Sequence, residues 1–181
     1  MMPVLATIRF GTATYGLDTE TIEEVNVTVD VADLATLSAL PRLRRLRVAV
    51  TDPHHDIPSG ITSLAPLAAL TALEELELPG ARVSDLTPLA GLTQLRVLDL
   101  TGALVDDVSP LRALTALTRL RLGATSVADV HPLAALTLLE ELNLAGTCVT
   151  DLGPLRGLDR LRILALEGAP VSDVTPVLAL P

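Results

Sequence analysis

The chain has 181 residues, of which 49% are apolar, and a formal net charge of −9. This length suits one domain with a continuous hydrophobic core. The 13 basic residues are all arginine, and they form neither a basic stripe nor a polybasic cluster. Because nucleic-acid affinity comes mainly from neutralising phosphates, this balance argues against a nucleic-acid partner. It also argues against binding to an anionic membrane surface.

The first residues, MMPVLATIRFG, do not read as a signal peptide. They lack a basic start, and Thr7 and Arg9 interrupt the apolar stretch. No segment approaches the roughly 18 uninterrupted apolar residues of a membrane-spanning helix. The single Cys148 excludes an internal disulfide framework. Together these features predict a cytoplasmic protein.

The N-terminal segment, residues 1–19, lies outside the pattern that fills the rest of the chain. Its apolar residues Val4, Ala6, Ile8 and Phe10 alternate with other residues, which predicts a strand with one buried face. Terminal units of a repeat array otherwise leave their apolar core open to water. We therefore expect this strand to cap the first unit of a repeat domain that covers residues 20–181.

Self-similar segments occupy the remainder of the chain. Five of them follow one another with a period of 22 residues, at 71–92, 93–114, 115–136, 137–158 and 159–180. Two less regular copies precede them: 20–40, and 41–70, which contains an eight-residue insertion at 52–59. A fixed period of this length predicts a solenoid, here with seven repeats.

Each repeat has the same internal order, which the copy at 71–92 illustrates. Leu73, Leu76 and Leu78 form the pattern L-x-x-L-x-L, whose period-2 alternation predicts a short strand with one buried face. Gly80 then permits a turn. Pro88 suits the first turn of a brief helical segment, where its missing N–H costs nothing.

These repeats resemble the leucine-rich repeat family, in the bacterial 22-residue variant with an x-D-[LIV]-x-P-L segment found in internalin-like domains. The resemblance covers roughly residues 20–180. It implies an α/β fold: a right-handed solenoid of about seven repeats with a parallel concave β-sheet and short 3-10 or helical convex turns. The chain departs from the family at the position after the strand, where asparagine usually bonds neighbouring coils. That position holds Ala81, Ala103, Thr125, Thr147 and Ala169.

An aspartate recurs before each convex segment. The column comprises Asp33, Asp85, Asp107, Asp129, Asp151 and Asp173, with Ser63 in the second repeat. A calcium ladder would require paired glycines and a period of about nine residues, and neither occurs. The more economical interpretation is that each aspartate accepts hydrogen bonds from free N–H groups just downstream and caps the convex turn.

The outward residues of the strands form the variable polar surface. Their charges mostly alternate from one repeat to the next, which predicts attraction between neighbouring strands. The same face could bind a protein partner, the usual role of solenoid curvature. The two interpretations are compatible. The candidate partner-binding residues on the strands are Arg45, Arg47, Glu75, Glu77, Asp99, Arg119, Arg121, Glu141 and Asn143.

The insertion DPHHDIPS at 52–59 adds His54 and His55 to these candidates. Adjacent side chains of an extended loop diverge, and zinc usually takes at least three protein ligands. Asp52 or Asp56 could supply a third ligand, but the remaining histidine, His131, belongs to a convex segment three repeats away. A recognition loop or a neutral insertion is therefore a better interpretation of this segment than a metal or catalytic site.

No catalytic motif, phosphate-binding loop or zinc signature is present, and no neighbour equips Cys148 as a nucleophile. The sequence predicts a non-enzymatic protein-interaction module that uses the concave face and the loop, without a metal or cofactor. A structural or sensor segment of a larger multidomain signalling protein is an alternative, and metal-dependent activity at His54 and His55 is another. The last segment, VTPVLALP, lacks a polar cap. We expect an end-to-end contact with another subunit there, or a continuation of the chain.

Overall fold

The computed structural model describes residues 5–10, 13–18, 22–28, 34–49 and 60–178. Their strands form two sheets: an antiparallel pair and a sheet of seven parallel strands in chain order. The pair consists of β1 (Leu5–Phe10) and β2 (Ala13–Asp18). The seven-stranded sheet consists of β3 (Glu24–Thr28), β4 (Arg45–Ala49), β5 (Glu75–Glu77), β6 (Val97–Asp99), β7 (Arg119–Arg121), β8 (Glu141–Asn143) and β9 (Ile163–Ala165).

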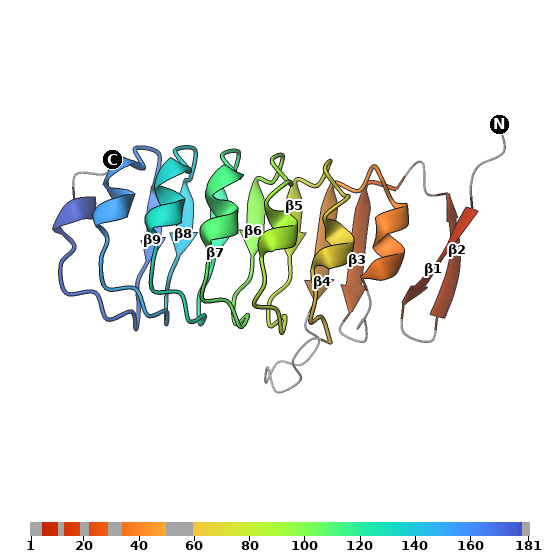
Figure 1. Cartoon of the computed structure of the whole chain (residues 1–181), viewed down its shortest axis with the longest axis horizontal. Helices are drawn as coiled ribbons and strands as arrows, with labels where there is room; N and C mark the ends of the chain where they lie inside the picture. The colour runs from red at the N-terminus through yellow and green to blue at the C-terminus, as the bar shows by residue number, and fades with distance from the viewer. Residues whose placement is uncertain (1–4, 11–12, 19–21, 29–33, 50–59, 179–181) are drawn as a thin grey trace.

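Short helical segments cover the opposite side of the coils, and all those described are 3-10 turns. They are η1 (Ala35–Ala39), η2 (Ala65–Leu67), η3 (Thr87–Leu89), η4 (Ser109–Ala113), η5 (His131–Ala135), η6 (Gly153–Gly157) and η7 (Thr175–Val177). From η2 onward each has proline in its first turn, where a missing N–H leaves no bond unmade. Figure 1 shows the coils stacked along the long axis, with the sheet on one side and the 3-10 turns on the other.

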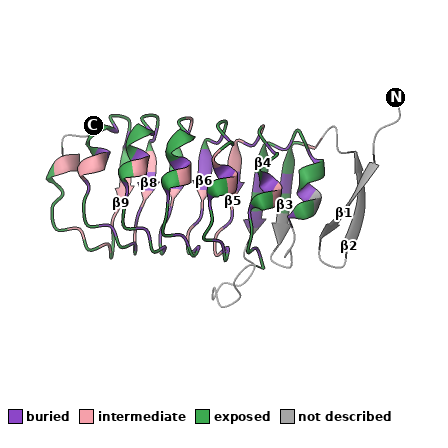
Figure 2. Ribbon diagram, viewed as in Figure 1, coloured by how far each residue is buried: buried purple, intermediate pink, exposed green. Residues whose placement is uncertain are grey.

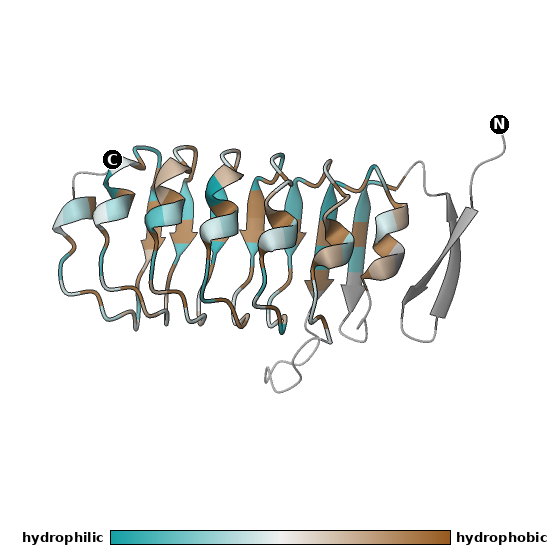
Figure 3. Ribbon diagram, viewed as in Figure 1, coloured by the Kyte–Doolittle hydropathy of each residue, from teal (hydrophilic) through white to brown (hydrophobic). Residues whose placement is uncertain are grey.

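The hydrophobic core is one continuous column of aliphatic side chains between sheet and turns. In the coil 71–92, Leu73, Leu76, Leu78 and Leu89 are each 0% exposed, as the repeat predicts. The equivalent leucines of neighbouring coils join the same core. Each coil contains both hydrophobic and hydrophilic residues, as the two colours within each coil show (Figure 3). Burial decreases at the C-terminal end of the stack, where no described residue after Leu161 is buried (Figure 2).

The turns after the strands depend on backbone bonds between coils. The N–H of Gly102 donates to the carbonyl of Gly123 at 2.8 Å, and the N–H of Gly146 donates to that of Glu167 at 2.7 Å. The hydroxyl of Thr125 instead donates to Leu122 within its own coil, at 2.6 Å, and Thr147 does the same. Backbone bonds therefore join these coils at the turns where the resemblance implies asparagine side chains, and the threonines satisfy a carbonyl of their own turn.

The N-terminal strand is present, and it pairs with a second strand that the alternation did not indicate. β1 and β2 form an antiparallel pair in register from Leu5 opposite Asp18 to Phe10 opposite Ala13. This pair is separate from the parallel sheet, and β1 packs beside η1. It stands at the N-terminal end of the stack (Figure 1), where a capping element is expected.

Candidate interaction surface on the concave sheet

The outward residues of the strands are aligned into columns by the strand pairing. One column runs through Glu24, Arg45, Glu75, Val97, Arg119, Glu141 and Ile163. A second runs through Asn26, Arg47, Glu77, Asp99, Arg121, Asn143 and Ala165. Both match the alignment expected from the repeat. Since neighbouring parallel strands lie about 4.8 Å apart, charged side chains of adjacent coils are within reach of one another.

At β3 and β4, arginines are bound along a column. Arg45 forms an ion pair with Glu24 at 2.6 Å. Hydrogen bonds, first from Asn26 and then from Arg45, lower the pKa of Glu24. Just before these strands, Arg44 bridges Glu23 at 3.8 Å and Glu74 at 2.6 Å. The cations of this part of the sheet are therefore neutralised within the protein.

Two further arginines each bind one carboxylate of the other column and one of their own column. Arg47 pairs with Glu75 at 3.0 Å and with Glu77 at 3.2 Å. Arg121 pairs with Glu141 at 3.0 Å and approaches Asp99 at 3.6 Å. The hydrogen bond to Glu141 raises the pKa of Arg121. Arg47 thus holds two carboxylates of β5, whereas Arg121 on β7 links a carboxylate of β6 to one of β8.

Asp99 and Asn143 have a second role at the ends of their strands. The Oδ1 atom of Asp99 accepts the N–H of Thr101 at 2.9 Å. The Oδ1 atom of Asn143 accepts the N–H of Ala145, also at 2.9 Å. Side chains that bond the backbone two residues on are typical of turns. These two residues are thus anchored to the sheet and present a fixed polar surface.

Arg119 differs from the other arginines that the sequence analysis selected. Within the described part of the chain, no ion pair or side-chain hydrogen bond involves it, and it is exposed. Arg96 is likewise exposed and forms no ion pair with any described residue. Arg96 was not among the residues predicted from the sequence to bind a partner. It belongs to a third column, formed by the residues just before the strands: Glu23, Arg44, Glu74, Arg96, Thr118, Glu140 and Arg162. The only available signal was its position between Glu74 and Thr118 in that column.

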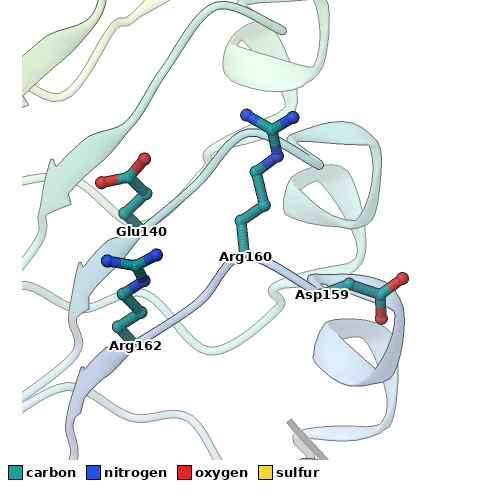
Figure 4. Close-up of a pocket in the computed structure, with 4 residues that line it drawn as sticks. All are labelled: Glu140, Asp159, Arg160 and Arg162. Atoms are coloured by element: carbon teal, nitrogen blue, oxygen red, sulfur yellow. The ribbon is translucent and has the colours of Figure 1, made fainter. Parts of the chain in front are cut away.

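A shallow hollow lies beside the N-terminal ends of β8 and β9. It is lined by Glu140, Asp159, Arg160 and Arg162. Figure 4 shows Glu140 and Arg162 projecting from neighbouring coils one above the other, while Arg160 extends away from Asp159. Two acidic and two basic groups line it, so the lining carries no formal net charge.

The convex aspartates cap the 3-10 turns, as expected. Asp85 accepts the N–H of Thr87 at 2.8 Å, and Asp107 accepts that of Ser109 at 2.8 Å. The three equivalent bonds involve Asp129, Asp151 and Asp173. Ser63 makes a longer bond of 3.2 Å to Ala65. Each carboxylate is occupied by its own turn, which supports capping over ion binding.

Hydrogen bonding stabilises the charged form of these aspartates. The pKa of Asp85 is lowered, first by the side chain and then by the N–H of Thr87. The pKa of Asp107 is lowered by the same two groups of Ser109, and that of Asp173 by those of Thr175. At Asp129 the N–H of His131 contributes most and its ring, 2.7 Å away, comes second.

Other candidate groups are dispersed. No described set of three or more histidine, cysteine, aspartate or glutamate side chains is grouped to hold a metal ion. Cys148 is exposed. His54 and His55, with the rest of the insertion, lie outside the described residues, as does Asp33. Among the residues that are described, no helix has the length and apolar character needed to cross a bilayer.

No protein-family model matches the sequence, and no curated protein matches it. Several solved structures are similar to this chain. An internalin (inlF) from Listeria monocytogenes has a TM-score of 0.74 and 27% identity, over 81% of this chain and 41% of that one. An internalin C2 (inlC2) from the same organism has a TM-score of 0.71 and 26% identity, over 91% and 79%.

A third similar structure is the functional domain of InlJ from Listeria monocytogenes, which includes a cysteine ladder. Its TM-score is 0.71 at 19% identity, over 86% of this chain and 32% of that one. At that identity the likeness concerns the fold alone. This chain spans less than half the length of the inlF and InlJ chains.

Proposed function

The chain is a leucine-rich-repeat protein with internalin-like coils, and from this premise we propose that it is a non-enzymatic module that binds a protein partner through its concave face. The observation that carries the proposal is the outward surface of the sheet, where mostly charged or polar side chains are aligned over seven strands. A rigid sheet of this kind presents side chains in fixed positions, which reduces the entropy lost on binding. The similarity to internalins supports an interaction role in general terms.

The proposed footprint comprises the strand residues selected from the sequence, together with His54 and His55 of the insertion at 52–59. Arginine is enriched among residues that dominate binding energy, and β4 and β7 each carry two arginines on this face. Because the face has no aromatic side chain, we expect a moderate, salt-sensitive interaction that electrostatic attraction accelerates.

The test starts by identifying a partner through affinity capture from the native host and mass spectrometry. The purified partner is then titrated calorimetrically with the wild type and with two charge-reversed forms, R119E/R121E and R45E/R47E. We expect at least one pair to weaken binding tenfold or more. The matched control is R112E/R156E, which reverses two exposed arginines of the convex turns η4 and η6.

Thermal unfolding must show that each variant remains folded, since reversal at β4 or β7 brings glutamates together. Equal affinity for all four proteins would rule out the concave face. Weaker binding by the convex control alone would place the footprint on the other side of the solenoid.

A structural or sensor role in a larger signalling protein is the second candidate. It is supported by the fraction of the inlF chain that this solenoid covers, 41%, although the inlC2 chain is covered to 79%. The two proposals make different predictions for the isolated solenoid. A structural segment binds no partner by itself, whereas an interaction module does.

We also propose a cytoplasmic location, supported by the lone thiol of Cys148, because disulfides are the usual stabilising device of exported domains. Cell fractionation with an antibody against the chain tests this. Recovery from the medium or the cell surface would contradict it.

A further inference from the structure

Arg96, immediately before β6, and Arg119, on β7, are neighbours in adjacent coils on the concave side. The N–H of Arg119 donates to the carbonyl of Arg96 at 3.0 Å, so the two backbones are directly bonded. Both side chains are exposed. Two long, flexible guanidinium side chains that start this close together can reach a common anionic group.

The carboxylates around this pair are already bound elsewhere. Glu74, whose carbonyl accepts the N–H of Arg96, has its carboxylate 2.6 Å from Arg44. Glu141, the strand neighbour of Arg119 on one side, is bound to Arg121 at 3.0 Å. On its other side, Arg119 faces Val97. The sequence places acidic residues next to both arginines, but the ion pairs direct those carboxylates away.

No other described carboxylate is in an ion pair with either arginine, including that of Glu140 in the next coil, whose N–H donates to the carbonyl of Thr118 at 2.8 Å. Val97 is apolar and only 5% exposed. The hydroxyl of Thr118 donates to the carbonyl of Arg96 at 3.1 Å and is not an anion. Glu75 lies opposite Val97, and its carboxylate is 3.0 Å from Arg47. Within the described part of the chain, these two guanidinium groups therefore keep their hydrogen-bonding capacity for an external acceptor.

Resting on the proposed function, we propose that Arg96 and Arg119 form a two-arginine site that binds an acidic side chain of the protein partner. The planar guanidinium fork matches a carboxylate and can bind it through two parallel hydrogen bonds. The site lies near the middle of the sheet (Figure 1), on β7 and immediately before β6, and residues that dominate an interface concentrate near its centre.

Charge complementarity favours an isolated acidic group over a polyanion. The two arginines are surrounded by Glu74, Glu75, Asp99 and Glu141, each of which is in an ion pair with Arg44, Arg47 or Arg121. A nucleic acid or an anionic membrane would have to extend over these carboxylates and over a chain of net charge −9. A single acidic side chain can contact the two arginines without approaching the surrounding carboxylates.

The test is an NMR titration of the full chain labelled with ¹⁵N, in low-salt buffer, observing the Nε–Hε signals of the arginines. The probe is the capped peptide Ser-Glu-Glu-Ser, and the neutral control is Ser-Gln-Gln-Ser. We expect the acidic peptide to cause saturable shifts, largest at Arg96 and Arg119. The glutamine peptide should cause shifts at least fivefold smaller.

Two variants define the site. R96A/R119A should raise the dissociation constant of the acidic peptide at least tenfold. R112A/R156A removes the same charge from the convex turns of nearby coils, and should leave that constant within twofold. Shifts that are largest at Arg45, Arg47 or Arg121, or equal losses in both variants, would overturn the proposal.

Parallel titrations with inorganic phosphate and with a short single-stranded DNA separate the possible sources of the anion. Tenfold tighter binding of either at Arg96 and Arg119 would overturn the assignment to an acidic protein segment. The failure of the two proposals can be told apart. If the peptide does not bind but R119E/R121E still loses the partner, only the two-arginine site falls. If the peptide binds as expected but every concave variant retains the partner, the proposed function falls.

Discussion

Arginines of the concave face differ in whether a carboxylate of a neighbouring strand already binds them. Arg45, Arg47 and Arg121 are in ion pairs, so a partner that binds them must first compete with an internal glutamate. Arg119 and Arg96 are in no ion pair with a described residue, so a partner can bind them without displacing an internal carboxylate. For a partner, an unpaired guanidinium is the more favourable contact, because it exchanges water rather than an existing ion pair.

Ala124 occupies a turn position where four other coils have glycine. Its φ is 55°, and Gly146 at the equivalent position has φ 66°. A left-handed conformation costs an L-residue about 1–2 kcal/mol, against roughly 0.4–1 kcal/mol of entropy saved in the unfolded chain. We therefore expect Ala124→Gly to raise the free energy of unfolding by about 0.5–1 kcal/mol, measured by urea denaturation.

Gly146→Ala is the reciprocal change and should lower stability by a similar amount. A Cβ there would be 3.7 Å from its nearest atoms, on Ala124, so backbone strain and not a clash decides the result. As a control, Ala134→Gly in the 3-10 turn η5 should destabilise. If Ala124→Gly also destabilises, the strain argument fails.

The convex aspartates predict a pH dependence of stability. Asp85, Asp107, Asp129 and Asp173 have a lowered pKa in the folded protein. Their contribution is therefore fully present above the unfolded value of about 3.9 and is lost as the pH falls through the lower folded values. The midpoint temperature of unfolding should therefore decrease as the pH is lowered below about 3.9.

Replacing all four by asparagine tests the origin of this fall. The amide oxygen can still cap but does not titrate, so the variant should lose less stability on acidification and remain similar to wild type at pH 7. An identical acid profile for both proteins would show that other carboxylates control it.

Each coil contributes one strand, one turn and one layer of the core. Leu120 in β7 is 0% exposed, whereas Leu104, in the turn after β6, is 58% exposed. Leu120→Ala should therefore cost about 2–5 kcal/mol of stability, and Leu104→Ala less than about 0.5 kcal/mol. Chemical denaturation of the two variants measures the difference. Similar losses would mean that the layers of the core are not as described.

Adding or removing a complete coil should preserve the solenoid, because each coil contacts its neighbours. Deleting residues 115–136 removes one 22-residue period and lets β6 pair with β8, with Leu98 opposite Leu142. We expect a folded, less stable protein that unfolds cooperatively, as judged by circular dichroism. Deleting residues 115–125 instead breaks the period and should give an aggregated or unfolded chain. Equal behaviour of the two deletions would contradict the modular description.

The period of the repeat was enough to predict the architecture. The pattern L-x-x-L-x-L in register over the copies fixes which residues face inward, and the structure confirms the strand alignment from Glu24 to Ile163. The capping role of the aspartates could also be predicted, because each bond spans only two residues. The second N-terminal strand could not, since β2 (Ala13–Asp18) contains Gly16 and lacks a clear alternation.

From the amino-acid order alone one can place every strand residue in its column, because the side-chain period and the repeat period are both regular. Only the tertiary structure decides which ion pairs form, since a guanidinium group can reach a carboxylate in its own column or in the next one. Arg121 binds Glu141 of the other column, whereas Arg44 binds Glu74 of its own column. These choices leave Arg96 and Arg119 without a carboxylate among the described residues. The alternation of charges does not predict that outcome, because it depends on distances between side chains of different coils.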